Sequence, residues 1–197
     1  MTVYFHGNFG LNREYMAGVL RTYMSDSKAT AADVAKPFGY KAPFSARYRS
    51  WLNKTGIIEA GRDFSLTPFG EVIWKNDPQL KSTATQWFLH HELTGDEERA
   101  EAWYYLGHEF LPKHESFTLQ DLRDGLSMKL MPHDPKHFAS GAPMIKVIAR
   151  KMVQCYLQSE GLGQLGLVSE SADGSFTVNS PVVLGPWRIP ADLATQY

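Results

Sequence analysis

The chain has 197 residues, of which 43% are hydrophobic and 21% charged, a composition typical of a folded globular protein and not of a disordered one. Its 20 basic and 21 acidic residues leave a formal net charge of -1, so an electrostatic partner must recognise a local patch. The single cysteine, Cys155, excludes an internal disulfide, and no apolar run is long enough to span a membrane. We therefore expect a cytoplasmic protein with no signal peptide and no membrane contact.

The first third of the chain predicts three helices followed by a hairpin. Apolar side chains recur at helical spacing in the first helix, and Thr30 is placed to cap the second, with Asp33 in its first turn. Strand-like residues 57–60 and 64–67 then flank a turn. This order is typical of a winged helix-turn-helix, whose third helix usually enters the major groove of DNA. The three helices are expected over residues 11–25, 28–38 and 43–54.

The middle of the chain is expected to be helical, and the last third to repeat the first architecture with a different sequence. We therefore expect a mainly α fold with small β wings, in which two winged helix-turn-helix units are joined by a helical middle. The first unit is expected over residues 1–75, a connector packed on both units over 76–115, and the second unit over 116–197. The later helices are expected over 68–74, 79–93, 96–111, 119–130 and about 143–160, and the second hairpin over 165–168 and 175–178.

Charge is distributed unevenly along the chain. From Lys36 to Arg62 there are six basic residues and one acid, and from Lys129 to Gln158 there are five basic residues and one acid. Residues 92–124, by contrast, contain nine acids and three bases. The two basic stretches coincide with the two expected third helices and their approaches. Because basic side chains that neutralise phosphates release counterions, these stretches indicate duplex DNA as a partner.

The candidate DNA contacts are the polar and basic side chains on and around the two expected third helices. An arginine such as Arg49 can contact guanine through two hydrogen bonds in the major groove. Arg62 lies at the expected hairpin tip, where a wing would touch phosphate, and Lys146 and Arg150 share a helix face at i and i+4. An ordinary solvated face is the alternative for both helices. The candidates are Lys41, Ser45, Arg47, Arg49, Asn53, Lys54, Arg62, Lys146, Arg150 and Lys151.

The sequence contains no glycine-rich phosphate loop and no Gly-x-Ser-x-Gly nucleophile motif. His133 and His137 are spaced as in some metal sites, but structural zinc usually takes four good ligands and the only thiol is Cys155. We expect that thiol to be buried and inert, and His90 to be a hydrogen-bonded packing histidine. Acidic residues over 92–101 are expected to be solvated helix caps. We therefore expect no metal, no cofactor and no catalytic residue.

Short motifs along the chain resemble one bacterial family. They are Phe38–Gly39–Tyr40, Arg49–Ser50–Trp51–Leu52, Gly56–Ile57–Ile58, Thr67–Pro68–Phe69–Gly70, Asp77–Pro78–Gln79–Leu80, Thr85–Gln86–Trp87–Phe88–Leu89–His90 and Trp103–Tyr104–Tyr105. In order and spacing they are similar to the "domain of unknown function 4007" family over roughly residues 5–125. That family usually opens with His-Glu-Thr-Phe followed by an arginine. This chain has His6–Gly7–Asn8–Phe9 instead, with Asn12 near the arginine position.

The resemblance implies a winged-helix protein encoded in a bacterial defence locus, often near sulfurtransferase-like genes of DNA phosphorothioation or a related phage-exclusion system. It identifies no catalytic residue. We therefore expect a non-enzymatic duplex-DNA-binding component that positions partner enzymes encoded nearby, and a homo-oligomer is compatible with this role. A protein–protein adaptor that uses the winged helices as a scaffold is the alternative, and a metal-dependent nuclease is a minor third one.

Overall fold

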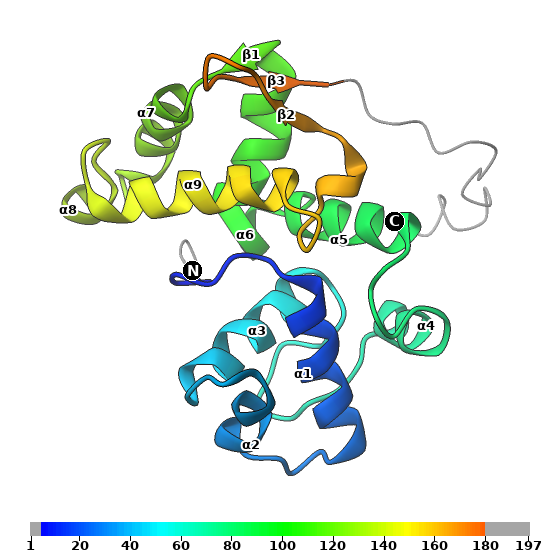
Figure 1. Ribbon diagram of the computed structural model, residues 1–197. Helices are drawn as coiled ribbons and strands as arrows, with labels where there is room; N and C mark the ends of the chain where they lie inside the picture. Colours follow the sequence, from blue (N-terminus) through cyan, green and yellow to red (C-terminus); the bar gives the residue numbers. More distant parts are fainter. Residues whose placement is uncertain (1–4, 180–197) are drawn as a thin grey trace.

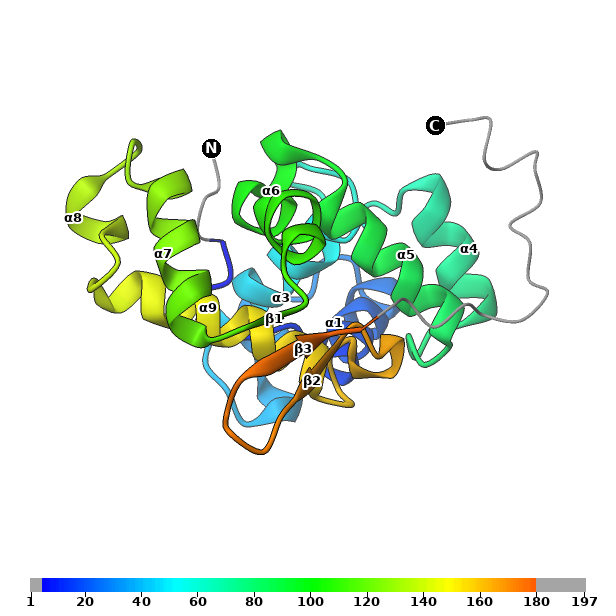
Figure 2. The same cartoon turned by 90° about the horizontal axis from the view of Figure 1, so that it is seen from above.

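The fold is mainly helical, as predicted, with one small sheet at the end of the molecule opposite the N-terminal helices (Figure 1). The computed structural model describes residues 5–179, so the expected first and last segments extend beyond the described residues at both ends. Seen from above in Figure 2, the third helix of the N-terminal group lies beneath the longest helix of the last third. Between residues 5 and 179 no helix is both long and apolar enough to cross a membrane.

Three helices form the N-terminal bundle, and local capping sets their ends. The Asn12 side chain accepts a hydrogen bond from the Tyr15 amide at the start of the first helix. Thr30 caps the second helix, as predicted, in a reciprocal capping box with Asp33. Gly56 follows the third helix with φ 71°, a left-handed conformation that glycine adopts at no steric cost. The elements are α1 (Arg13–Ser25), α2 (Ala31–Ala35), the 3-10 turn η1 (Lys36–Phe38) and α3 (Pro43–Lys54).

The hairpin predicted after α3 is reduced to one antiparallel bridge, between Ile58 and Leu66. A backbone hydrogen bond from Glu59 to Ser65 continues the pairing by one step, and residues 59–63 are exposed. The prediction of two short strands was therefore wrong in extent. The carbonyl groups of this loop accept hydrogen bonds from a side chain of α3 instead of from a second strand, as described below.

The middle of the chain is helical, but its last predicted helix is interrupted. Ala100 has the non-helical angles φ -154° and ψ 69°. Residues Tyr105–Phe110 form a π-helical turn in which a Cβ on Gly107 would lie 2.9 Å from Cβ of Thr94. The π-helical turn thus packs closely against the end of the helix over Thr83–Thr94, and this packing accompanies the departure from the regular helix predicted over 96–111. The elements are α4 (Pro68–Asn76), α5 (Thr83–Thr94), α6 (Glu97–Tyr104), η2 (Tyr105–Phe110) and the 3-10 turn η3 (Leu111–Lys113).

The last third contains a three-stranded antiparallel sheet where the sequence predicts a hairpin alone. Its strand order is β1-β3-β2, so the strand that precedes the helices pairs with the last strand of the hairpin. The first strand has only two residues, too few to show an alternating pattern, and it was not predicted. Its elements are β1 (Ser116–Phe117), α7 (Leu119–Leu130), α8 (Pro135–Phe138), α9 (Pro143–Leu157), the 3-10 turn η4 (Gly163–Leu165), β2 (Val168–Glu170) and β3 (Phe176–Val178).

A continuous aromatic core connects the N-terminal bundle, the middle helices and α9. Trp51 of α3 packs against Trp103 of α6 with ring centroids 5.5 Å apart, and Trp103 lies 6.3 Å from the ring of Tyr156 on α9. All three side chains are buried. Because aromatic residues bury large areas, this column makes a major contribution to holding the parts of the chain together.

Arg13 forms a second connection, which is polar and buried. Its guanidinium group donates to the carbonyl oxygens of Leu80 and Gly161, each at 2.5 Å, and to that of Ser159. Its backbone amide donates to the Glu160 carbonyl at 2.8 Å. The start of α1 is thereby bound both to the loop before α5 and to the turn after α9.

Candidate nucleic-acid interface

One side of α3 faces the protein core, and Ser45 belongs to that side. Tyr48, Trp51 and Leu52 are at most 2% exposed and belong to the core. Ser45 is 1% exposed, and its hydroxyl donates to the Ala31 carbonyl at 2.6 Å. The expected place of Ser45 on an accessible face is therefore corrected: α2 packs over it, and its hydrogen bond is made inside the bundle.

Arg49 holds the loop that follows α3. Its Nη2 atom donates to the carbonyl oxygens of Gly61, Arg62 and Asp63 at 3.1, 2.6 and 2.7 Å. Its guanidinium carbon lies 5.7 Å from the centroid of the Tyr23 ring, within cation–π range. Arg49 therefore has a structural role that sequence reasoning did not anticipate, and its Nη2 group already has acceptors within the protein.

Two further candidates on α3 also face the protein. Asn53 donates through Nδ2 to the Ile58 carbonyl at 3.1 Å. Lys54 is half-buried, and burial, followed by the positive charge of Arg99, lowers its pKa, while Asp96 acts in the opposite direction. Neither side chain is presented to solvent as an ordinary surface residue.

The remaining candidates of the N-terminal bundle are accessible. Lys41, Arg47 and Arg62 are all exposed. Arg47 also donates through Nη1 to the Phe5 carbonyl at 2.9 Å, which uses one of its five N–H groups. Three of the seven candidates in this part of the chain are therefore displayed on the surface.

The candidates on α9 are more accessible than those on α3. Lys146 and Arg150 are exposed and one helical turn apart. Lys151 is half-exposed, and its aliphatic stem packs on the N-terminal segment: a Cβ on Gly10 would lie 3.4 Å from Lys151 Cδ. The opposite side of α9 is apolar and buried.

The ion pairs of the described residues lie elsewhere. Lys129 pairs with Glu97 at 2.7 Å and with Glu109 at 2.8 Å, and Arg99 pairs with Glu92. Over residues 5–179 no ion pair involves the exposed candidates. These are Lys41, Arg47, Arg62, Lys146 and Arg150. The acidic middle of the chain therefore leaves their charges without a carboxylate partner.

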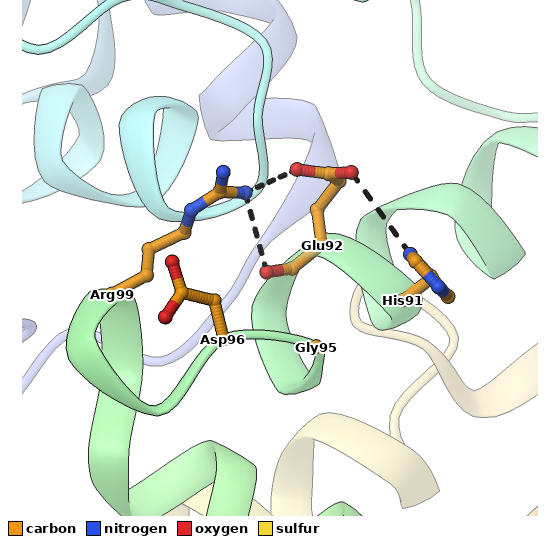
Figure 3. Close-up of a pocket in the computed structure, with 5 residues that line it drawn as sticks. All are labelled: His91, Glu92, Gly95, Asp96 and Arg99. Atoms are coloured by element: carbon orange, nitrogen blue, oxygen red, sulfur yellow. Dashed lines mark hydrogen bonds and ion pairs between the residues drawn. The ribbon is translucent and has the colours of Figure 1, made fainter. Parts of the chain in front are cut away.

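A small pocket of about 120 Å³ lies where α5 ends and α6 begins (Figure 3). Arg99 reaches across it to the Glu92 carboxylate, and Asp96 lies beside the guanidinium group. The Glu92 carboxylate also packs on the end of α3, because a Cβ on Gly56 would lie 2.7 Å from Glu92 Oε2. Glu92 thus pairs with Arg99, the Asp96 side chain accepts from the Glu98 amide as the cap of α6, and we interpret the pocket as a structural junction.

The histidines considered as metal ligands pair with carboxylates one by one. His137 Nδ1 lies 2.5 Å from Asp134 Oδ2, and His133 Nε2 lies 2.8 Å from Glu101 Oε2. Among the residues that the structure describes, no group of three or more His, Cys, Asp or Glu side chains is placed to hold a metal ion.

The predicted roles of His90 and Cys155 are confirmed. His90 Nδ1 and the Tyr156 hydroxyl are 2.8 Å apart and share a hydrogen bond, and burial lowers the pKa of His90 to about 4. Cys155 is buried, and burial raises the pKa of its thiol to about 12. A thiol with such a pKa is not a nucleophile near neutral pH.

The opening motif, to which the sequence assigned no role, lies between the two basic helices. We call residues 5–10 the N-terminal strap. The Trp51 indole of α3 donates to the Phe9 carbonyl at 3.1 Å, and the His6 ring stacks on Trp51 with centroids 5.4 Å apart. In the sequence, this segment stood out only because it departs from the family's usual opening. Nothing in its local pattern showed that it would meet α9.

A family model described as "Protein of unknown function (DUF4007)" matches residues 44–179, more than half of the chain. No curated protein matches the chain.

Two solved structures are similar in fold. One is described as "Magnesium ion-bound SspB crystal structure", with a TM-score of 0.69, and the other as "SspB crystal structure", with a TM-score of 0.64. Each is 18% identical in sequence, and each match covers 91% of this chain and 61% of the other. The chain thus spans less than two thirds of the length of these proteins, and the likeness shows a shared fold.

Proposed function

This chain belongs to the DUF4007 family, and we propose that it is a non-enzymatic protein that binds duplex DNA in a bacterial anti-phage defence or DNA-modification system. In this role it holds DNA while partner enzymes carry out the chemistry. Its DNA-binding surface consists of the exposed basic side chains around α3 and on α9. Ser45 is left out of this surface because it is buried.

The observation that carries the proposal is the separation of paired from unpaired positive charge. Lys129 and Arg99 are neutralised by the acidic middle, whereas Lys41, Arg47 and Arg150 are exposed and have no carboxylate partner among residues 5–179. Unpaired cations attract the phosphate backbone of DNA, and their counterion release favours binding. A nearly neutral protein can therefore bind a polyanion through one part of its surface.

The chain order of the last third supports a winged-helix interpretation. A strand precedes α7, α9 is followed by a hairpin, and the first strand pairs with the last. In the winged-helix interpretation α9 is the third helix, and its exposed Lys146 and Arg150 face the duplex. For the N-terminal bundle, α1 to α3 and the loop closed by the Ile58–Leu66 bridge correspond to a unit with a much reduced wing.

The test is a fluorescence-anisotropy titration of a labelled duplex. We expect the triple variant Lys41→Ala/Arg47→Ala/Arg62→Ala and the double variant Lys146→Ala/Arg150→Ala each to weaken binding by at least about tenfold near physiological salt. The control is Lys75→Ala/Lys113→Ala, which removes two exposed lysines of the middle segment. Equal affinity of the wild type and both basic-patch variants would overturn the proposal.

An incubation of the same duplex distinguishes binding from cleavage. One of the structures similar in fold is described as bound to magnesium ion, so the duplex is incubated with the protein in Mg²⁺ and, separately, in chelator. We expect the duplex to stay intact and bound in both. Cleavage that requires Mg²⁺ would show a nuclease and contradict the non-enzymatic role.

A protein–protein adaptor is the second candidate, and one observation favours it. Met128 and Met131, at the end of α7, are 75% and 43% exposed. Exposed methionines are adaptable contacts for a protein partner. If the protein co-purifies with a neighbouring defence protein, loses that partner in Met128→Ser/Met131→Ser, and shows no DNA affinity, the adaptor role replaces the DNA-binding role.

A further inference from the structure

The N-terminal strap, residues 5–10, is bound along α3 by three hydrogen bonds. Arg47, Tyr48 and Trp51 donate to the carbonyl oxygens of residues 5, 10 and 9, at 2.9, 3.1 and 3.1 Å. The donors occupy two successive turns of α3, so they hold the whole strap in an ordered path. On its other side the strap touches α9, through the contact between Gly10 and Lys151.

Two cations from different parts of the fold each lie against this strap. A Cβ on Gly7 would lie 3.2 Å from Arg47 Nε, and one on Gly10 would lie 3.4 Å from Lys151 Cδ. The strap therefore has glycines where the two basic side chains lie on it, and no strap side chain covers either of them at these positions. The His6 side chain of the strap is buried. Its burial, together with the charges of Lys151 and Arg47, lowers the pKa of His6 to about 4.

These cations are not neutralised by the protein. In the part of the chain that the structure describes, neither Arg47 nor Lys151 forms an ion pair, whereas Lys129 lies within 2.8 Å of two glutamates. Arg47 is exposed and Lys151 half-exposed, so each of them is accessible to an anion. A phosphodiester group fits this pair, because its oxygens accept charge-assisted hydrogen bonds from a guanidinium group and from an ammonium group at once.

We propose that Arg47 and Lys151 bind the same backbone phosphate of a nucleic-acid duplex across the N-terminal strap. This inference rests on the proposed DNA binding and makes it more specific: α3 and α9 form one composite phosphate site, and neither helix acts as an independent recognition element there. The strap sets the spacing between the two cations. Lys146 and Arg150 lie on the adjoining exposed face of α9 and extend the contact to further phosphates.

The test is a double-mutant cycle read through the salt dependence of duplex binding. Arg47→Gln removes one charge while keeping a polar side chain, and Lys151→Gln removes the other charge. Each lost phosphate contact lowers the slope of log K against log salt by about 0.9. If both residues bind one phosphate, the double variant loses only one phosphate contact, and its slope falls by about 0.9. The affinity losses of the two single variants are then not additive.

The matched control pairs Arg47→Gln with Arg150→Gln. Because Arg150 is expected to contact a different phosphate, its effect adds to that of Arg47, so the slope loss of this double variant equals the sum of the two single losses. Additive losses for the Arg47–Lys151 pair would overturn the shared site, as would unchanged binding in both single variants. Either result leaves the proposed function standing if Lys146→Ala/Arg150→Ala still weakens binding.

Two further measurements distinguish free phosphate from duplex phosphate, and failure of this inference from failure of the proposed function. Inorganic phosphate at millimolar concentration should compete with the duplex no better than chloride at equal ionic strength, because the proposed ligand is a phosphate within a continuous backbone. Strong competition by free phosphate would contradict a nucleic-acid site here. If wild-type protein binds no duplex at low salt, both this inference and the proposed function fail.

Discussion

The helices α3 and α9 carry similar numbers of basic residues, yet they use them differently. Arg49 of α3 donates to the carbonyl groups of the loop that follows, whereas Arg150 of α9 is exposed. The loop after α3 has a single backbone bridge, while β2 and β3 pair over three residues. Backbone carbonyls that lack a ladder need other donors, and the nearest helix supplies them. The number of basic residues on a helix therefore does not measure how much charge the helix presents.

Each of these two helices packs against a buried neutral histidine, α3 against His6 through Trp51 and α9 against His90 through Tyr156, and low pH should destabilise both contacts. Burial holds the pKa of both His6 and His90 at about 4, whereas an unfolded histidine titrates near 6.5. Between these values the unfolded chain binds protons that the folded protein does not. Stability is therefore complete above pH 6.5 and is lost as the pH falls toward 4, by about 2 kcal/mol per histidine at pH 5.

Urea unfolding at pH 7.5 and pH 5 measures this loss. The matched variant is His90→Gln, which retains a hydrogen-bonding group toward Tyr156 but does not titrate in this range. Its stability should depend on pH less than that of the wild type, by about 2 kcal/mol over the interval. The same loss in both proteins would show that His90 is not kept neutral by burial.

Arg13 connects α1 to the turn after α9, and Arg13→Met should break that connection. The change leaves the buried carbonyl oxygens of Leu80 and Gly161, and the more accessible one of Ser159, without their donor, which should lower the free energy of unfolding by about 3 kcal/mol. Denaturant unfolding measures it, with Arg21→Met, an exposed arginine of the same helix, as the control. A loss below about 1 kcal/mol, no larger than for a typical surface site, would contradict the role assigned to Arg13.

A pair of substitutions sharpens the comparison of α3 with α9. Arg49→Met removes the donor for three loop carbonyls and should cost about 1–2 kcal/mol of stability, because this group is partly exposed and water replaces some of the bonds. Arg150→Met should change stability by less than about 0.5 kcal/mol and weaken duplex binding instead. Thermal unfolding and anisotropy on both variants provide the two readouts. The reverse outcome would show that the two helices have the opposite roles.

Local sequence was sufficient to predict most helices and several of the residues that they bury. The bounds of α3 and α7 match the predicted ranges, and Thr30 caps α2, because capping and apolar periodicity involve residues only three or four positions apart. The same reasoning placed Cys155 and His90 inside. These features depend on neighbours along the chain.

Only the tertiary structure decided which basic side chains remain available to a partner. Arg49 meets carbonyls 12 to 14 residues away, Arg47 meets one 42 residues away and Arg13 meets one 148 residues away. A charged side chain points wherever the fold places unpaired acceptors, and no local pattern records that position. The amino-acid sequence thus determined the helices and the basic composition of two of them, while long-range packing brought Arg47 and Lys151 to the same strap.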